Sequence, residues 1–310
     1  MTNMEQNMHT ISDVERDTGV AKETLRVWER RYGFPQPERD AHGERLYPAA
    51  QLERLRLIKR LLDQGYRPGK VMALGVDELA DLGGRSHAEP VWRGDDPDLA
   101  ACLVLIKEHR LAELRQRMSQ VLLQKGMRGF VLDLMAPLTA AVGDQWAAGH
   151  LAVFEEHLYA ETVQSVMRSA LYSASMQPGQ ATASPRILLT TVPQERHGLG
   201  LLMAEALFVL EGAHCVSLGV QTPLADIVEA ARVQQADVVA LSFSSMMTPR
   251  AAVDNVNELQ SRLGSDVVVW AGGGSAAMAR RQLDPGCVLD LDAIPAAVAR
   301  WRARQAAPAS

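Results

Sequence analysis

The chain has 310 residues, of which 47% are apolar and 22% charged, and its net charge is −5. This ordinary globular composition excludes a wholly disordered chain, and the length suggests two or three domains. No apolar run approaches the roughly 18 residues of a membrane span, and the start lacks the pattern of a secretory signal. The three cysteines are far apart, which predicts neither a disulfide framework nor a zinc cluster and favours the cytoplasm.

Positive charge is concentrated near the start of the chain. Residues 21–72 contain 12 Lys and Arg against 7 Asp and Glu. Residues 8–78 have a helical pattern with one interruption. A first short helix can begin after Thr10 or Ser12 and end near Gly19, and a second follows directly. Two short helices at this spacing are typical of a helix-turn-helix.

The second helix, residues 22–31, carries cations at helical spacing, so they can share one face. These cations are Lys22, Arg26, Arg30 and Arg31. Such a row can reach phosphates or guanine edges while Leu25 and Trp28 anchor the helix inward. Residues 33–43 are too rich in Gly and Pro for a helix and could form a wing, and a third helix can begin at Pro48. The pattern alone leaves a solvated basic helix on a small helical domain as the alternative.

The string through LRVWERRYGFP and RLYP closely resembles the winged helix-turn-helix domain of MerR-family regulators. The resemblance implies that the second helix enters the major groove of promoter DNA. The DNA-binding residues that it implies are Lys22, Arg26, Arg30 and Arg31, with Tyr32, Arg45 and Tyr47 towards the backbone. Family members typically continue into a dimerising coiled coil. Here residues 79–95, broken by glycines and Pro90, predict a linker, so dimerisation is expected to come from later segments.

Two further segments follow the linker. Residues 96–176 show apolar stripes with short glycine breaks, which predicts four amphipathic helices in a bundle. Residues 184–305 alternate short β-branched runs with helical patterns, which predicts a Rossmann-like, doubly wound parallel sheet. The expected strands are residues 186–191, 215–220, 237–243, 267–271 and 287–291. The predicted fold class is therefore multidomain, α and α/β.

Polar and glycine-rich residues follow several of these strands, where a doubly wound sheet binds its ligands. They are Glu195, His197, Gly198 and Gly200 after the first strand, Ser242 and Ser244 at the third, and Gly272, Gly273 and Gly274 at the fourth. A histidine with a carboxylate two residues earlier has the parts of a metal ligand and its supporting acceptor. From chemistry alone, a histidine at the place of His197 is more often a hydrogen-bonded loop residue, and a glycine run is usually a simple turn. No complete G-x-G-x-x-G or P-loop is present, which disfavours a dinucleotide fold.

The order E-x-H-x-x-G, then S-x-S, then G-G-G resembles the cobalamin-binding fold of methionine synthase and corrinoid proteins. This resemblance implies that His197 is the lower axial ligand of cobalt, that Glu195 supports it, and that Gly200 gives room to the displaced nucleotide tail. The serines and the glycine run would line the slot for that tail. Ser244 stands where the family has Leu, which weakens the assignment of the slot but not that of the ligand.

Trp146, followed after nine residues by Glu156 and His157, matches the W-x9-E-H pattern of CarH/LitR-type cobalamin photoreceptors. Those proteins also have a MerR-like head, a bundle and a cobalamin fold in this order. The resemblance implies that Trp146 packs against the adenosyl group of adenosylcobalamin and that Glu156 and His157 complete the pocket. Ordinary burial habits alone would make Trp146 a core aromatic residue and the other two a surface pair.

The same resemblance implies a light-responsive transcriptional repressor. In the dark it would be an adenosylcobalamin-bound tetramer on operator DNA, and photolysis of the cobalt–carbon bond would release the DNA. The family has a histidine after the cap tryptophan, whereas this chain has Ala147, so His150, His157 or water is expected above cobalt after light.

Three other functions are compatible with some of the same domains. They are a regulator of the same fold that needs no cofactor, a regulator that docks a protein antirepressor, and a corrinoid methyltransferase carrier. The carrier would require a substrate domain or partner that the sequence does not supply, so we expect the protein not to be an enzyme.

Overall fold

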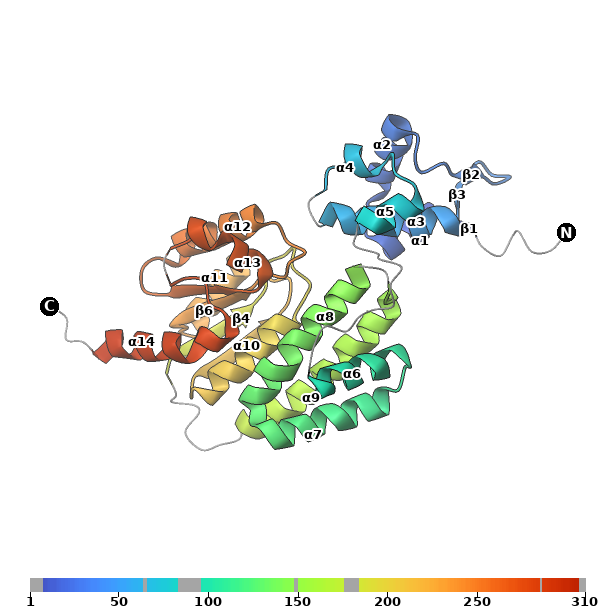
Figure 1. Cartoon of the computed structure of the whole chain (residues 1–310). Helices are drawn as coiled ribbons and strands as arrows, with labels where there is room; N and C mark the ends of the chain where they lie inside the picture. Colours follow the sequence, from blue (N-terminus) through green and yellow to red (C-terminus); the bar gives the residue numbers. More distant parts are fainter. Residues whose placement is uncertain are drawn as a thin grey trace. The chain divides into compact units, whose positions relative to one another are not determined.

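The computed structural model describes residues 8–63, 66–82, 96–147, 150–175, 184–284 and 286–306 (Figure 1). The chain divides into two compact units, Met1–Val91 with Gln145–His150, and Trp92–Asp144 with Leu151–Ser310. Most of the predicted linker, residues 83–95, lies outside the described residues, whereas residues 79–82 belong to a helix. None of the described helices is long and apolar enough to cross a membrane.

The first unit contains the predicted DNA-binding head. Its helices are α1 (Ile11–Thr18), α2 (Lys22–Tyr32), α3 (Ala49–Asp63), α4 (Pro68–Val71) and α5 (Val76–Leu82). Its antiparallel sheet, in the order β1-β3-β2, is formed by β1 (Met8–Thr10), β2 (Glu38–Arg39) and β3 (Arg45–Pro48). The strands β2 and β3 confirm the expected wing, and β1 was not predicted from the sequence.

Local sequence explains the ends of the first helices. Thr10, rather than Ser12, caps α1, because its hydroxyl accepts from the N–H of Asp13 while the Asp13 carboxylate accepts from the N–H of Thr10. Gly19 ends the helix with a left-handed φ of 69°. Pro48 pairs with Met8 as the last residue of β3, so α3 begins one residue later than predicted.

The second unit begins with the predicted helical bundle. Its elements are α6 (Pro97–Lys107), α7 (Leu111–Gly129), the π-helical turn η2 (Phe130–Met135), α8 (Ala136–Ala147) and α9 (Val153–Ser175). The break between the second and third helices is a kink at Gly126, with φ 68° and ψ 175°, followed by η2. Helices α7 and α9 both pack against α10 (Leu199–Leu210), the first helix of the sheet region.

The sheet region has the predicted parallel, doubly wound topology. Its strands, in the order β5-β4-β6-β7, are β4 (Arg186–Thr190), β5 (His214–Gly219), β6 (Val238–Ser242) and β7 (Val268–Gly272). Helices α10 and α14 (Ile294–Ala306) lie on one face, and α11 (Leu224–Val233), α12 (Pro249–Leu263) and α13 (Gly274–Ala279) lie on the other side (Figure 1). The second side encloses an apolar core that includes Leu188, Val239, Ile227 and Val256.

The fifth predicted strand, residues 287–291, is wrong as a full strand. It makes a single bridge, from Val288 to Ala271. A turn in which the N–H of Cys287 donates to the carbonyl of Asp284 precedes it, and the 3₁₀ turn η5 (Leu291–Ala293) follows it at once. Too few extended residues are left between these turns to form a ladder.

Candidate functional site

A polar loop follows strand β4 at the carboxyl edge of the sheet. The strand ends at Thr190, and the chain passes through Glu195 and His197 before α10 begins at Leu199. Strand β4 lies between β5 and β6, so this loop opens where the strand order reverses. Ligands of open α/β sheets bind at this position.

Glu195 and His197 form the pair that the sequence predicts. Nδ1 of His197 lies 2.6 Å from Oε1 of Glu195, and the main-chain N–H of His197 donates to the same oxygen at 2.9 Å. A carboxylate at Nδ1 holds the proton of a neutral imidazole there and leaves the lone pair of Nε2 available. Nε2 makes no hydrogen bond within the described residues, and 41% of the side chain is exposed. His197 therefore has the donor atom for one bond to a metal.

Ser244 holds the other oxygen of this carboxylate. Its N–H and its hydroxyl both donate to Oε2 of Glu195 at 2.8 Å. Glu195 is only 2% exposed. Burial by itself raises the pKa of Glu195, but the hydrogen bonds from His197 and Ser244 outweigh it, so the pKa is lowered. The carboxylate stays ionised at neutral pH, and the Ser244 hydroxyl, which the sequence analysis assigned to the tail slot, supports Glu195.

Two glycines let α10 approach the neighbouring strand ends. A Cβ added to Gly200 would lie 2.9 Å from Oγ of Ser242, which closes β6. A Cβ added to Gly198 would lie 3.0 Å from Cγ1 of Val220, just after β5. The first turn of α10 therefore lies directly against side chains at the ends of both neighbouring strands, and a residue larger than glycine would displace them.

The glycine run after β7 packs against the chain that leaves β6. Gly273 has φ 96°, and a Cβ there would lie 2.2 Å from the carbonyl oxygen of Phe243. A Cβ on Gly274 would lie 3.2 Å from Cβ of Ser245. The predicted residues after β4, β6 and β7 are thus brought to one edge. An imidazole nitrogen open to a ligand, a buried carboxylate that supports the ring, and glycines that keep the neighbouring strand ends close together fit a corrinoid whose cobalt is held by one histidine.

The cap residues predicted on the bundle are less closely grouped. Glu156 and His157 lie in the first turns of α9, with Nε2 of His157 3.6 Å from Oε2 of Glu156, and the His157 side chain is 70% exposed. Trp146 is half-buried near the end of α8, in the segment Gln145–His150 that belongs with the first unit. Its position over the cofactor stays a prediction.

The sequence analysis missed Glu155, which is the buried carboxylate of this region. It is 4% exposed and accepts from the main-chain N–H of Ala152 at 2.6 Å, from Nζ of Lys107 at 3.2 Å and from Nε2 of His109 at 3.0 Å. Glu155 therefore ties the end of α6 to the start of α9. An acidic residue in the first turn of a helix was the available signal.

The head presents its predicted cations on α2. Arg26, Arg30 and Arg31 are exposed, and the guanidinium of Arg31 lies 5.3 Å from the ring centre of half-buried Tyr32. Lys22 is half-buried, and its Nζ lies 3.5 Å from Glu15. Leu25 and Trp28 are buried on the other side of the helix, as the pattern predicts.

Two residues predicted to face the DNA backbone, Tyr47 and Arg45, make contacts within the head. Tyr47 is completely buried in the core of the head, so the expectation that it reaches a phosphate is corrected. Nε of Arg45, on β3, donates to Oε2 of Glu29 at 2.9 Å. This ion pair fastens the wing to α2. The apolar ring of Tyr47 stands at the alternating inward position of its strand, which explains its burial.

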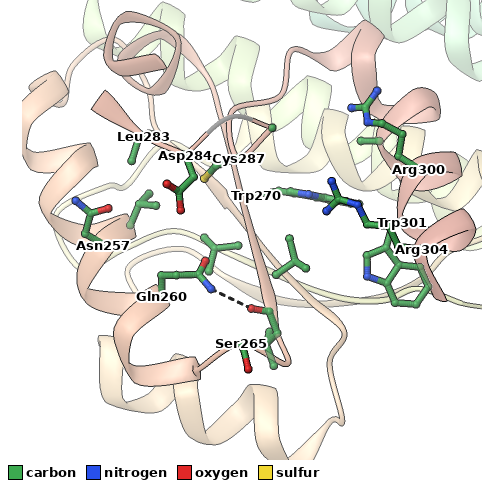
Figure 2. A pocket seen from close by; sticks show the side chains of 16 residues that line it. Asn257, Gln260, Ser265, Trp270, Leu283, Asp284, Cys287, Arg300, Trp301 and Arg304 are labelled. Carbon is green, nitrogen blue, oxygen red and sulfur yellow. Dashed lines mark hydrogen bonds between the residues drawn. The ribbon is translucent and has the colours of Figure 1, made fainter. Parts of the chain in front are cut away.

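A cavity of about 240 Å³ lies beside β7, but none of its lining residues belongs to the predicted site (Figure 2). Asp284 and Arg304 stand on opposite sides of it, and Gln260 closes one end by donating to the carbonyl of Val267 at 3.3 Å. Asp284 and Cys287, which line it, precede the single bridge at Val288. The cavity thus lies along the first part of β7, before the bridge to Val288.

Comparisons with known proteins divide the chain as the geometry does. Residues 9–74 match the family of MerR HTH regulatory proteins, and residues 98–170 and 185–291 match two B12 binding domains. The chain is 28% identical to the HTH-type transcriptional repressor CarH of Myxococcus xanthus, over 88% of this chain and 91% of the relative. It is 27% identical to the repressor CarA of the same organism, over 77% of each chain.

Among solved structures, the monomethylamine corrinoid protein of Methanosarcina barkeri is similar, with a TM-score of 0.50 and 16% identity. The match covers 63% of this chain and 94% of that protein, and it supports the fold alone. The head, the bundle and the sheet region thus each have a matching family or fold. The chain combines a MerR HTH regulatory domain with B12-binding domains, and it is similar to a transcriptional repressor along most of its length.

Proposed function

We propose that this protein is a cobalamin-dependent transcriptional repressor whose DNA binding is controlled by light. The observation that carries the proposal is the imidazole of His197, which has Nδ1 held by buried Glu195 and Nε2 available at the carboxyl edge of the sheet. Adenosylcobalamin held there would supply a cobalt–carbon bond that visible light can break. The repressor assignment follows the two relatives named as repressors, which match most of the chain.

The chain's own residues divide the work. His197 would hold the cofactor from below, with Glu195 and Ser244 keeping the ring in place. Trp146, Glu156 and His157 would form the cap above it. The exposed arginines of α2 would bind promoter DNA, mainly through phosphates, so we expect the affinity to fall with salt. Promoter DNA as the partner supports our proposal that the protein acts in the cytoplasm.

A change in oligomeric state would couple movement of the cap to the affinity for DNA. Several heads on one tetramer raise each other's effective concentration, so weak single heads bind tightly together. Without the adenosyl contact, Trp146, Glu156 and His157 would no longer hold the cap in place, so the tetramer would dissociate and the affinity for DNA would fall. This would be a ligand switch acting on a packing interface. Water, His150 or His157 would bind the cobalt after light, and Nδ1 of His150 lies 3.0 Å from Oε1 of Gln145.

A mobility shift of promoter DNA tests the proposal. Protein reconstituted in the dark with adenosylcobalamin should retard the DNA, and the same sample should lose retardation after illumination. His197→Ala should lose cofactor and light response together. The matched control is His214→Ala, at the opposite end of the sheet in β5. Equal retardation of dark and illuminated wild type would contradict the light response.

The second candidate is the same regulator without a light response, controlled by another ligand or by a protein antirepressor. Ala147, which stands where the photoreceptor family has histidine, favours it.

Illuminated wild type, His150→Ala and His157→Ala should differ in their absorption spectra if either histidine ligates cobalt. Identical spectra would leave water as the upper ligand.

A further inference from the structure

The loop that carries His197 is fastened at two places. One is the pair of hydrogen bonds from Ser244 to the Glu195 side chain, described above. The other is the side chain of Thr191, which is completely buried. Its hydroxyl donates to the main-chain carbonyl of Glu195 at 2.5 Å and accepts from the main-chain N–H of Gln221 at 2.8 Å.

Further hydrogen bonds join the loop that carries His197 to the residues that follow β5. The main-chain carbonyl of Thr191 accepts from the N–H of Thr222 at 3.0 Å, and the Gln221 side chain donates to the carbonyl of Pro193 at 3.1 Å. The hydroxyls of Thr190 and Thr222 lie 2.7 Å apart. The residues Gln221 and Thr222, just after β5, therefore brace the His197 loop from the side away from β6.

Both main-chain polar groups of Glu195, the N–H and the carbonyl, make hydrogen bonds. Its N–H donates to the carbonyl of Val192 at 2.9 Å, and its carbonyl receives the Thr191 hydroxyl. With the main chain fixed, the carboxylate can meet His197 and Ser244 at once. We propose that Thr191 is a positioning residue for His197, acting through Glu195, and that Gln221 supports it. This inference rests on the proposed cobalamin site.

Thr191→Val keeps the shape of the side chain but leaves the carbonyl of buried Glu195 and the N–H of Gln221 without their partner. Such unpaired groups are costly, so the loop should rearrange to satisfy them and turn Glu195 away from the ring. We expect cobalamin affinity to fall about ten-fold. Thr191→Ser retains the hydroxyl and should stay within about two-fold of wild type.

The test uses the full-length protein labelled with ¹⁵N-histidine and loaded with cobalt(II) cobalamin. Electron paramagnetic resonance separates cobalt bound by a labelled imidazole from cobalt bound by the cofactor's own ¹⁴N base, because the two nuclei split the signal differently. Wild type and Thr191→Ser should show the ¹⁵N splitting, and Thr191→Val should show a reduced ¹⁵N fraction. A purely structural role would lower the melting temperature and leave this fraction unchanged.

The outcomes separate the two levels of inference. Wild type without ¹⁵N splitting would remove the proposed site and this inference together. Wild type with the splitting and Thr191→Val with an equal fraction would remove only the role of Thr191. Gln221→Gly, which suits the left-handed φ of 60° and removes only the bond to Pro193, gives a second reading if Thr191→Val does not fold. Its ¹⁵N fraction should also fall, and an unchanged fraction would overturn the bracing by this loop.

Discussion

Oε1 of Glu195 lies 2.6 Å from Nδ1 of His197, and the carboxylate that it belongs to is 98% shielded from solvent while nearly half of the imidazole is accessible. The pair therefore combines a fixed, ionised acceptor with a ring nitrogen that can meet a ligand.

Glu195→Gln should weaken cobalamin retention about ten-fold or more, because a neutral amide orients the ring less firmly and lowers the basicity of Nε2. Equilibrium dialysis in the dark measures the change. The control is Glu258→Gln on α12, where the carboxylate pairs with exposed Arg262 far along the chain from the site. Equal retention by Glu195→Gln and wild type would contradict the supporting role of the carboxylate.

The lowered pKa of Glu195 makes apo-protein stability depend on pH. A carboxyl whose folded pKa is below its unfolded value of 4.5 contributes stability above that pH and loses it as the pH falls through the folded pKa. We expect the free energy of unfolding to drop on acidification below 4.5, and the drop to be smaller in Glu195→Gln. Urea unfolding at several pH values measures both curves, and parallel curves would argue against the prediction.

Gly273→Ala should destabilise the sheet region by more than about 2 kcal/mol, since the new Cβ combines a left-handed φ with a clash against main chain. Gly264→Ala is a matched control, because Gly264 also has a positive φ of 76° but open space around its Cβ. Its cost should be about 1 kcal/mol. Denaturant unfolding of the two variants compares them, and equal losses would show that the contact with Phe243 is unimportant.

Arg30→Ala should weaken binding to promoter DNA and reduce the slope of log affinity against log salt by about one, as expected for one phosphate contact. Fluorescence anisotropy across a salt series measures both quantities. Arg250→Ala is the control, since its side chain is 91% exposed on α12 in the other unit. An unchanged slope in Arg30→Ala would exclude Arg30 from the phosphate contacts.

Much of the fold was predictable because its signals are local. The cap at Thr10, the stop at Gly19, the cationic row on α2 and the alternation of strands and helices each depend on residues within a few positions of one another. The approximate location of the site was predictable for the same reason. Parallel strands end at a common edge, so the residues after β4, β6 and β7 had to meet there.

The sequence by itself determined the kinds of elements, their order, and the pairing of Glu195 with His197 two residues later. Only the tertiary structure decided which distant groups complete that pair: Ser244, 49 residues away, and the bridge from Thr191 to Gln221, 30 residues away. It also decided that Tyr47 is buried and that the fifth strand is reduced to one bridge. Such outcomes depend on how strands and loops pack across long separations, and no local pattern carries that information.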